Sequence, residues 1–286
     1  IMPSLVGSEM CIRDSDFETY LIMGTDKTGA DSKVYQGSMS DFLMLVIVDK
    51  TDNNYSFLPI NRDTMSEVRL IQDDGTGVAT AELQLCTAHW YGGNAEQSCA
   101  NTVESISKLF GGLKINGYYA IPMDAIPKLN HSVGGVTVTL LEDFQDIDRH
   151  MKKGETLALS DEQAYRYIHD RYGVGDEKNT SRMKRQQQYM EAFFTKAKEK
   201  AKSDKAYVGQ LFREFEQTAT TNLTAKKISG LTNRLIKGTQ KGFFEIKGTS
   251  KIGKALGDGI DHAEFYPDKE SIIDVMTKIY GLKKRE

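Results

Sequence analysis

The sequence lacks three features that mark large classes of protein. It has no excess of positive charge, because 37 Lys and Arg residues stand against 40 Asp and Glu residues, and this balance argues against a nucleic-acid-binding protein. No stretch approaches the roughly 18 consecutive apolar residues of a membrane-spanning helix. The longest apolar run, at 42–48, has the length of a buried strand. No cysteines or histidines have the spacing of a zinc site.

Cysteine is scarce in the sequence. When residues 1–15 are set aside with Cys11, two cysteines remain, Cys86 and Cys99. They could form a disulfide in an oxidising compartment or remain two free thiols, and both alternatives stay open at this point. Residues 1–15 have neither a helical nor a strand period and no signal-peptide pattern, so we interpret them as a non-native or disordered leader. We treat residues 16–286 as a single domain with a helical C-terminal part.

Apolar residues make up 39% of the chain, which is enough for a proper core. Their patterns predict strands that alternate with helices, and this alternation is typical of an α/β fold in which helices cover both faces of a central sheet. Strands are expected at 17–23, 42–48, 55–60, 115–121, 134–140 and 243–248. Helical segments are expected at 82–110, 123–130, 181–202, 206–219, 222–238 and 268–280, and a glycine-rich loop at 248–262. A further helix is expected to follow the cap Ser160, and the run RYIHDRY is interpreted as the end of a strand or helix.

Charged residues gather at the ends of the first three predicted strands. Asp26 follows the first strand, Asp41 precedes the second, and Arg62 and Asp63 follow the third. If the second and third strands form an antiparallel hairpin and the first runs parallel to the third, all four residues reach one sheet edge. Two carboxylates beside an arginine there indicate a magnesium site with a phosphate clamp. The alternative is that the aspartates cap turns and Arg62 pairs with Asp63 for structure.

A second group of cations lies between Tyr165 and Phe194. Ser181 is expected to cap a helix whose first turn presents Arg182, Arg185 and Gln186, and His169 and Arg171 lie just upstream. The apolar stripe of this helix is expected at Met183, Met190, Phe194, Ala197 and Ala201. Backbone N–H groups, the helix dipole and planar guanidinium groups together favour an anion. The alternative is a solvated basic helix start.

In this order, the segments resemble the LytR-CpsA-Psr family of cell-wall phosphotransferases. The resemblance covers about residues 20–200 and rests on MGTD, SDFLMLVIVD, LPINRDTM, AHWYGG, NTVESISKLFGGLKINGYYAI, VGGVTVTL and YIHDRYGVGDEKNTSRMKRQQQ. It implies a mixed sheet with an apolar lipid-binding cavity, and an enzyme at the extracytoplasmic face of the bacterial membrane. The implied reaction uses Mg²⁺ to move a glycopolymer, such as teichoic acid or capsule, from a polyprenyl pyrophosphate carrier to a peptidoglycan hydroxyl, with pyrophosphatase side activity.

The resemblance also implies roles for individual residues. By matching motif, Asp26 and Asp41 hold the metal, and Asp63 orients Arg62 or accepts the proton of the incoming hydroxyl. The implied pyrophosphate-binding residues are Arg62, His169, Arg171, Arg182, Arg185 and Gln186. The resemblance further implies a membrane-anchoring helix upstream of residue 16, and an extracytoplasmic setting favours a disulfide between Cys86 and Cys99.

The sequence departs from the family pattern at three positions. Met39 and Phe42 stand where the family has Arg and Thr, and His169 stands where it has Arg. Fewer cations favour an alternative function, a non-catalytic module that binds polyprenyl phosphate or anionic glycan. A third possible function is a transcriptional attenuator, but the sequence shows no basic helix that could read DNA.

Overall fold

The structure, a computed structural model, describes residues 16–26, 37–72 and 74–281. These residues form two compact units. The first comprises the chain up to Pro122, Thr218–Ile228 and the chain from Lys237 onward, and the second comprises Met123–Gln217 and Ser229–Ile236. The expectation of one domain over residues 16–286 stays a prediction, and the leader at 1–15 lies outside the described residues.

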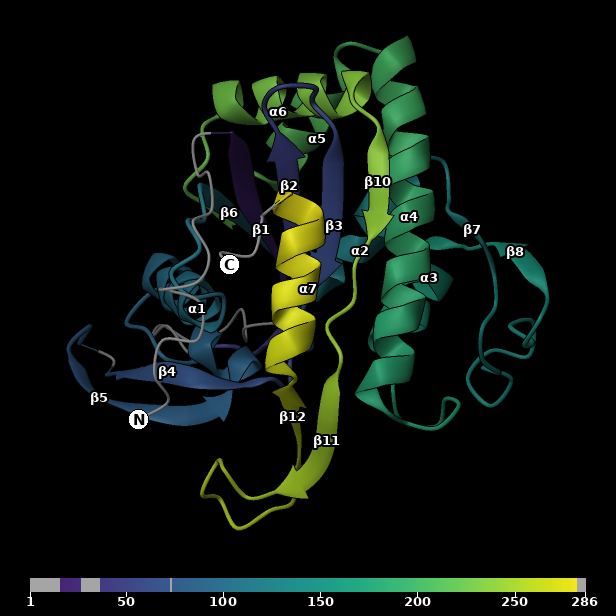
Figure 1. Cartoon of the computed structure of the whole chain (residues 1–286). Helices are drawn as coiled ribbons and strands as arrows, with labels where there is room; N and C mark the ends of the chain where they lie inside the picture. The colour runs from purple at the N-terminus through teal and green to yellow at the C-terminus, as the bar shows by residue number, and fades with distance from the viewer. Residues whose placement is uncertain (1–15, 27–36, 73, 282–286) are drawn as a thin grey trace. The chain divides into compact units, whose positions relative to one another are not determined.

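A mixed sheet forms the centre of the first unit (Figure 1). Its strand order is β10-β3-β2-β1-β6-β9. β2 pairs antiparallel with both β1 and β3, and β6 runs parallel to β1. β1 and β3 are therefore parallel to each other, and the predicted mixed α/β sheet is confirmed. The strand bounds are β1 Phe17–Thr25, β2 Ser40–Asp49, β3 Tyr55–Pro59, β6 Gly117–Pro122, β9 Thr220–Thr221 and β10 Gln240–Phe243.

Two helices of the first unit cover one face of this sheet, α1 (Ala95–Leu109) and α7 (Lys269–Tyr280). Leu43 and Ile47 share a core with Ile106 of α1 and Met276 of α7, because alternate residues of β2 point to the same face. Burial of these apolar side chains is the main force that holds the helices on the sheet. The predicted final helix is thus confirmed.

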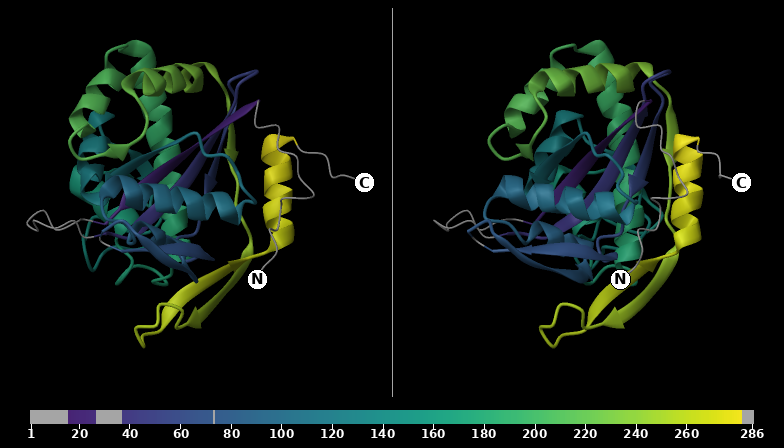
Figure 2. Two further views of the ribbon diagram at one scale, coloured as in Figure 1. Left: turned by 90° about the vertical axis from the view of Figure 1, so that its left-hand side faces the viewer. Right: turned by 60° about the vertical axis from the view of Figure 1, so that its left-hand side comes forward.

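Two hairpins of the first unit correct the sequence predictions. Strands β4 (Met65–Ile71) and β5 (Gly77–Gln84) and a single 3-10 turn, η1 (Leu85–His89), precede α1, so the helical segment predicted from residue 82 begins at Ala95 instead. The predicted glycine-rich loop at 248–262 contains β11 (Gly248–Gly253) and ends where β12 (His262–Pro267) begins. The two strands pair as a hairpin that projects beyond the sheet (Figure 2). The strand predicted at 243–248 lies earlier in the chain, as β10. Pairing between segments distant in sequence decides the secondary structure of these segments. For example, Phe265 of β12 donates its N–H to the Asp63 carbonyl.

The second unit is mainly helical. It contains η2 (Met123–Ala125), α2 (Ile126–Ser132), α3 (Asp161–His169), α4 (Asn179–Ser203), α5 (Tyr207–Phe215) and the short hairpin of β7 (Thr137–Thr139) and β8 (Thr156–Ala158). Helix α6 (Ala225–Lys237) contributes residues to both units. In the described ranges, no helix combines the length and the apolar character needed to cross a membrane.

The start of α4 differs from its prediction. The N-cap is Lys178, three residues before the predicted cap Ser181, so the helix begins at Asn179. The Ser181 side chain bonds to Asp176 instead of capping the helix. Its buried face carries Arg182, Arg185, Gln186, Tyr189 and Phe193. Of the predicted apolar stripe only Ala201 is buried, so the stripe through Met183 and Met190 was wrong. Binary patterning fails here because polar side chains occupy the buried face.

Candidate functional site

The strand register brings four of the predicted site residues to one end of the sheet. Thr25 pairs with Ser40, and Met44 pairs with Pro59, so Asp26, Asp41 and Arg62 all lie near the same edge. One carboxylate oxygen of Asp26 lies within 4.8 Å of one of Asp41. The backbone of Asp26 is tied to the same place, because its N–H donates to the Met39 carbonyl at 3.0 Å. The predicted convergence within the first unit is therefore confirmed.

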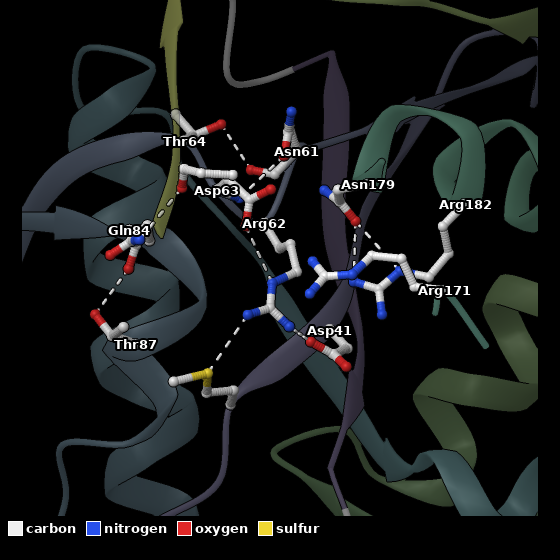
Figure 3. Close-up of polar contacts among 12 residues, drawn as sticks. Asp41, Asn61, Arg62, Asp63, Thr64, Gln84, Thr87, Arg171, Asn179 and Arg182 are labelled. Atoms are coloured by element: carbon white, nitrogen blue, oxygen red, sulfur yellow. Dashed lines mark hydrogen bonds and ion pairs between the residues drawn. The ribbon is translucent and has the colours of Figure 1, made fainter. Parts of the chain in front are cut away.

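Arg62 lies at the centre of this group (Figure 3). Its Nη1 atom forms an ion pair with Asp41, and its Nε lies 3.3 Å from Oδ1 of Asp63. Its NH2 group contacts the Met39 sulfur at 3.5 Å. Arg62 therefore pairs with Asp63, as the alternative interpretation predicts. It also contacts the predicted metal ligand Asp41.

The turn that carries Arg62 is held along its backbone. Asn61 forms an Asx turn, with its side-chain oxygen accepting the Asp63 N–H at 2.9 Å. The Arg62 carbonyl accepts from the Cys86 N–H at 3.0 Å, and the Asp63 carbonyl accepts from the Phe265 N–H at 2.8 Å. Segments far apart in sequence therefore fix the direction in which Arg62 points.

The environment of Arg62 keeps its charge. Burial by itself would lower the pKa of the guanidinium, but Cys86, Asp63 and Asp26 nearby raise that pKa above its ordinary value. Burial also raises the pKa of the Cys86 thiol to about 11, against the opposing effect of Arg62. Arg62 is therefore a permanent cation beside the carboxylates of Asp26, Asp41 and Asp63.

Cys86 and Cys99 are free thiols in the structure. The disulfide that the resemblance favours is therefore not present. The two side chains have different surroundings: Cys86 lies beside Arg62, whereas Cys99 Sγ lies 3.6 Å from Nε2 of His89. Both thiols are buried, and burial raises the pKa of Cys99 to about 12.

Asp26 and Asp41 offer a donor set that suits Mg²⁺. The ion prefers oxygen ligands at about 2.1 Å in an octahedron, which places two such oxygens about 3 to 4 Å apart. The Asp26 and Asp41 oxygens are at most 4.8 Å apart, so small side-chain rotations bring them into that range. Asp41 is 7% exposed and therefore largely desolvated, and its negative charge gains from a cation in either form, Arg62 or a metal.

In the second unit, two predicted residues lie where α3 ends. His169 is the last residue of α3, and its ring stacks on Tyr165 with 4.7 Å between ring centroids. Its Nδ1 lies 3.1 Å from the Asp170 carboxylate. The Arg171 guanidinium lies over the Tyr172 ring, with 4.6 Å from Cζ to the centroid.

Two more predicted residues lie on the first turns of α4. Arg182 is buried and donates to the Asn179 side chain from Nε and Nη2, at 3.2 and 2.9 Å (Figure 3). Gln186 donates to the Ile168 carbonyl at 3.1 Å, which ties α4 to the last turn of α3. The structure thus brings Arg182 and Gln186 onto one helix face near the end of α3.

Arg185, also predicted to bind substrate, is occupied inside the second unit. Its Nε lies 2.7 Å from the Glu142 carboxylate, and its NH groups donate to the carbonyls of Tyr167 and Asp170. The side chain is 1% exposed, and burial lowers its pKa while Glu142 opposes that effect. This environment favours a role in holding the chain around His169.

Sequence reasoning missed several supporting residues. Asn61 carries a recognisable signal, since Asn two residues before Asp63 is typical of an Asx turn. Glu142 and His89 carry none, because a lone acidic or imidazole side chain does not indicate its distant partner.

Comparisons with known proteins agree with this fold. The model of the LytR_cpsA_psr family matches residues 7–278. A polyisoprenyl-teichoic acid–peptidoglycan teichoic acid transferase, TagU, from Bacillus cereus is 26% identical over 275 residues, 95% of this chain and 80% of the relative.

Solved structures with the same fold include TagT bound to LIIa-WTA, with TM-score 0.65 and 19% identity, covering 96% of both chains. Another is protein gbs0355 of Streptococcus agalactiae, with TM-score 0.71 and 21% identity, covering 96% of this chain and 91% of that one. The family match extends over nearly the whole chain and includes both units. This chain therefore belongs to the LytR-CpsA-Psr family.

Proposed function

We propose that this protein is a magnesium-dependent phosphotransferase at the extracytoplasmic face of the bacterial membrane. It moves a glycopolymer from a polyprenyl pyrophosphate carrier to a hydroxyl of peptidoglycan. Family membership and the naming of the TagU relative as a teichoic acid transferase support this reaction class. The observation that carries the proposal is the group of Asp26, Asp41, Arg62 and Asp63 at one end of the sheet.

In this reaction the residues of the first unit act on the pyrophosphate. The NH2 group of Arg62 contacts the Met39 thioether, a weak acceptor, so a phosphate oxygen can replace that contact at little cost. The acceptor hydroxyl attacks the phosphorus that carries the glycopolymer, and its proton passes to the Asp63 carboxylate. The bond to the bridging oxygen breaks, and polyprenyl phosphate leaves with the electron pair. When water replaces the acceptor, the same step is pyrophosphate hydrolysis.

Asp26 and Asp41 would hold Mg²⁺, which neutralises charge on the phosphates when bound. Phosphoryl transfer requires mainly positioning and charge neutralisation, so these carboxylates and Arg62 supply most of what the first unit contributes. We further propose that His169, Arg171, Arg182 and Gln186 of the second unit bind the same pyrophosphate, and that an apolar cavity holds the prenyl chain.

The test is release of polyprenyl phosphate from a polyprenyl-pyrophosphate-linked saccharide, with and without peptidoglycan acceptor. Asp41→Asn and Arg62→Ala are expected to lower turnover about 100-fold or more, because each removes preorganised charge from the transition state. Removal of divalent ions with EDTA should abolish turnover, and added MgCl₂ should restore it.

Matched controls lie in the same elements. Asp49→Asn changes the carboxylate at the other end of β2, and Arg69→Ala removes a surface arginine of β4 that is 47% exposed. Both should retain turnover close to wild type. Unchanged turnover in Asp41→Asn and Arg62→Ala would refute the transferase mechanism.

The alternative, a binding module for polyprenyl phosphate, has one supporting observation. Met39 occupies the place beside Arg62 where the family pattern has a second cation, so the charge available to a diphosphate is reduced. In that case the wild type binds the lipid but never releases polyprenyl phosphate, and Arg62→Ala lowers binding alone.

A further inference from the structure

The short segment Gly37–Asp41 connects the predicted site residues of the first unit. It contains Asp41, which pairs with Arg62. Its Met39 carbonyl accepts the Asp26 N–H at 3.0 Å, and its Met39 sulfur contacts Arg62 at 3.5 Å. A shift of this segment would therefore move both predicted metal ligands and disturb Arg62 together.

Residues at the end of the turn η1 hold this segment in place. Nδ1 of His89 lies 2.9 Å from the Ser38 carbonyl, and a carbonyl can only accept, so Nδ1 carries the proton and donates. Next to it, a Cβ on Gly37 would lie 1.9 Å from the Trp90 carbonyl oxygen, so only glycine allows this approach. His89 and Ser38 are 4% and 7% exposed, and water therefore competes little for this hydrogen bond.

The surroundings of His89 keep the imidazole in one state. Burial lowers the pKa of His89, while the bond to Ser38 opposes that effect, so the ring is neutral at physiological pH. Nε2 is then the acceptor nitrogen, and it faces the Cys99 thiol at 3.6 Å. Burial and the Ser38 carbonyl keep the ring in the tautomer that donates to Ser38.

The same turn also holds Arg62, because the Cys86 N–H in η1 donates to the Arg62 carbonyl at 3.0 Å. We infer that His89 is a positioning residue, which through Ser38 sets the placement of Asp26 and Asp41 relative to Arg62. The functional part of this inference rests on the proposed function. The role of η1 in holding the segment Gly37–Asp41 does not rest on the proposed function.

The test uses the full chain and begins with hydrogen–deuterium exchange. His89→Leu removes the donor while keeping similar bulk, and it should raise exchange at the Asp26 amide about tenfold, the factor that corresponds to one lost hydrogen bond. Gly37→Ala should have the same effect by displacing the segment from Trp90. His89→Asn, which can place an amide N–H near the position of Nδ1, should restore much of the protection. Helices α1 and α7 should keep their protection in all variants.

The second readout is binding of Mn²⁺, followed by its electron paramagnetic resonance signal. Affinity should fall about tenfold in His89→Leu and recover in His89→Asn. Cys99→Ala, which removes the contact on the other side of the ring, should leave both readouts near wild type. Unchanged exchange at Asp26 in His89→Leu, or a uniform loss of protection that includes α7, would overturn the inference.

The two proposals fail in different ways. If wild-type protein shows no turnover but the exchange pattern follows the expectation, the positioning role stands and the proposed function is wrong. If wild type turns over substrate and His89→Leu changes neither exchange nor Mn²⁺ affinity, the function stands and the positioning role is wrong.

Discussion

At the scale of single residues, the buried ion pair of Arg185 and Glu142 has the largest expected effect on stability. Arg185 is 1% exposed and Glu142 is 12% exposed, so neither charge is well solvated. Removal of one partner leaves the other charge buried without compensation, which costs about 3 to 5 kcal/mol, whereas removal of both is far less costly.

Arg185→Met should therefore lower the free energy of unfolding of the second unit by about 3 kcal/mol or more, and Arg185→Met combined with Glu142→Leu should recover most of that loss. Chemical denaturation measures both. Arg166→Met is the control, because its partner Glu162 is 75% exposed and such pairs contribute about 1 kcal/mol or less. A double variant as unstable as Arg185→Met would show that the pair does not act as a unit.

The two described cysteines give a second prediction at this scale. With pKa values raised to about 11 for Cys86 and about 12 for Cys99, the thiolate fraction of Cys86 at pH 8 is about one in a thousand. The neutral thiols are favoured below these values, so reactivity should rise only as the pH approaches 11.

In a Cys11→Ser background, native protein at pH 8 should therefore not react with Ellman's reagent, and denatured protein should react at both positions. Mass spectrometry of the labelled protein measures this. Absence of reaction after denaturation without reductant would indicate a disulfide and contradict the free thiols of the structure.

The residues most readily predicted from sequence are those at strand ends. Asp26, Asp41, Arg62 and Asp63 could be placed together because strand direction alone decides which ends meet. His89 and Glu142 could not, since their partners Ser38 and Arg185 lie 51 and 43 residues away along the chain, and no local pattern connects them.

At the scale of elements, local signals predicted helix starts unevenly. Ser160 caps α3 with a full capping box, in which its hydroxyl accepts the Gln163 N–H and the Gln163 side chain accepts the Ser160 N–H. Near the start of α4, Ser181 is also a serine, but it does not cap the helix. The hairpins β4–β5 and β11–β12 were missed because strand pairing, which decides them, is not a local property.

Ser160→Ala should destabilise the second unit by about 1 kcal/mol, because it leaves helix N–H groups without a partner. Ser181→Ala should cost less, since Ser181 lies inside the first turn of α4. Thermal denaturation compares the two variants. Equal losses, or a larger loss in Ser181→Ala, would contradict the assignment of the cap.

At the scale of the whole molecule, the candidate site residues come from both compact units. Asp41 and Arg62 belong to the first, and Arg171, Arg182 and Gln186 belong to the second. The sequence order of the motifs predicted the family, and the family match over residues 7–278 confirmed it. The division into two units could not be predicted, because no linker or change in composition marks it.

The central proposal is that Arg62 and Arg182 bind one pyrophosphate. A double-mutant cycle of Arg62→Ala and Arg182→Ala on the affinity for polyprenyl pyrophosphate tests it most directly. Two groups that bind the same diphosphate should be coupled by about 1 kcal/mol or more. The control cycle of Arg69→Ala and Arg182→Ala should show none. The claim predicts this coupling for Arg62 and Arg182, and strictly additive losses, or no loss in either single variant, would contradict it.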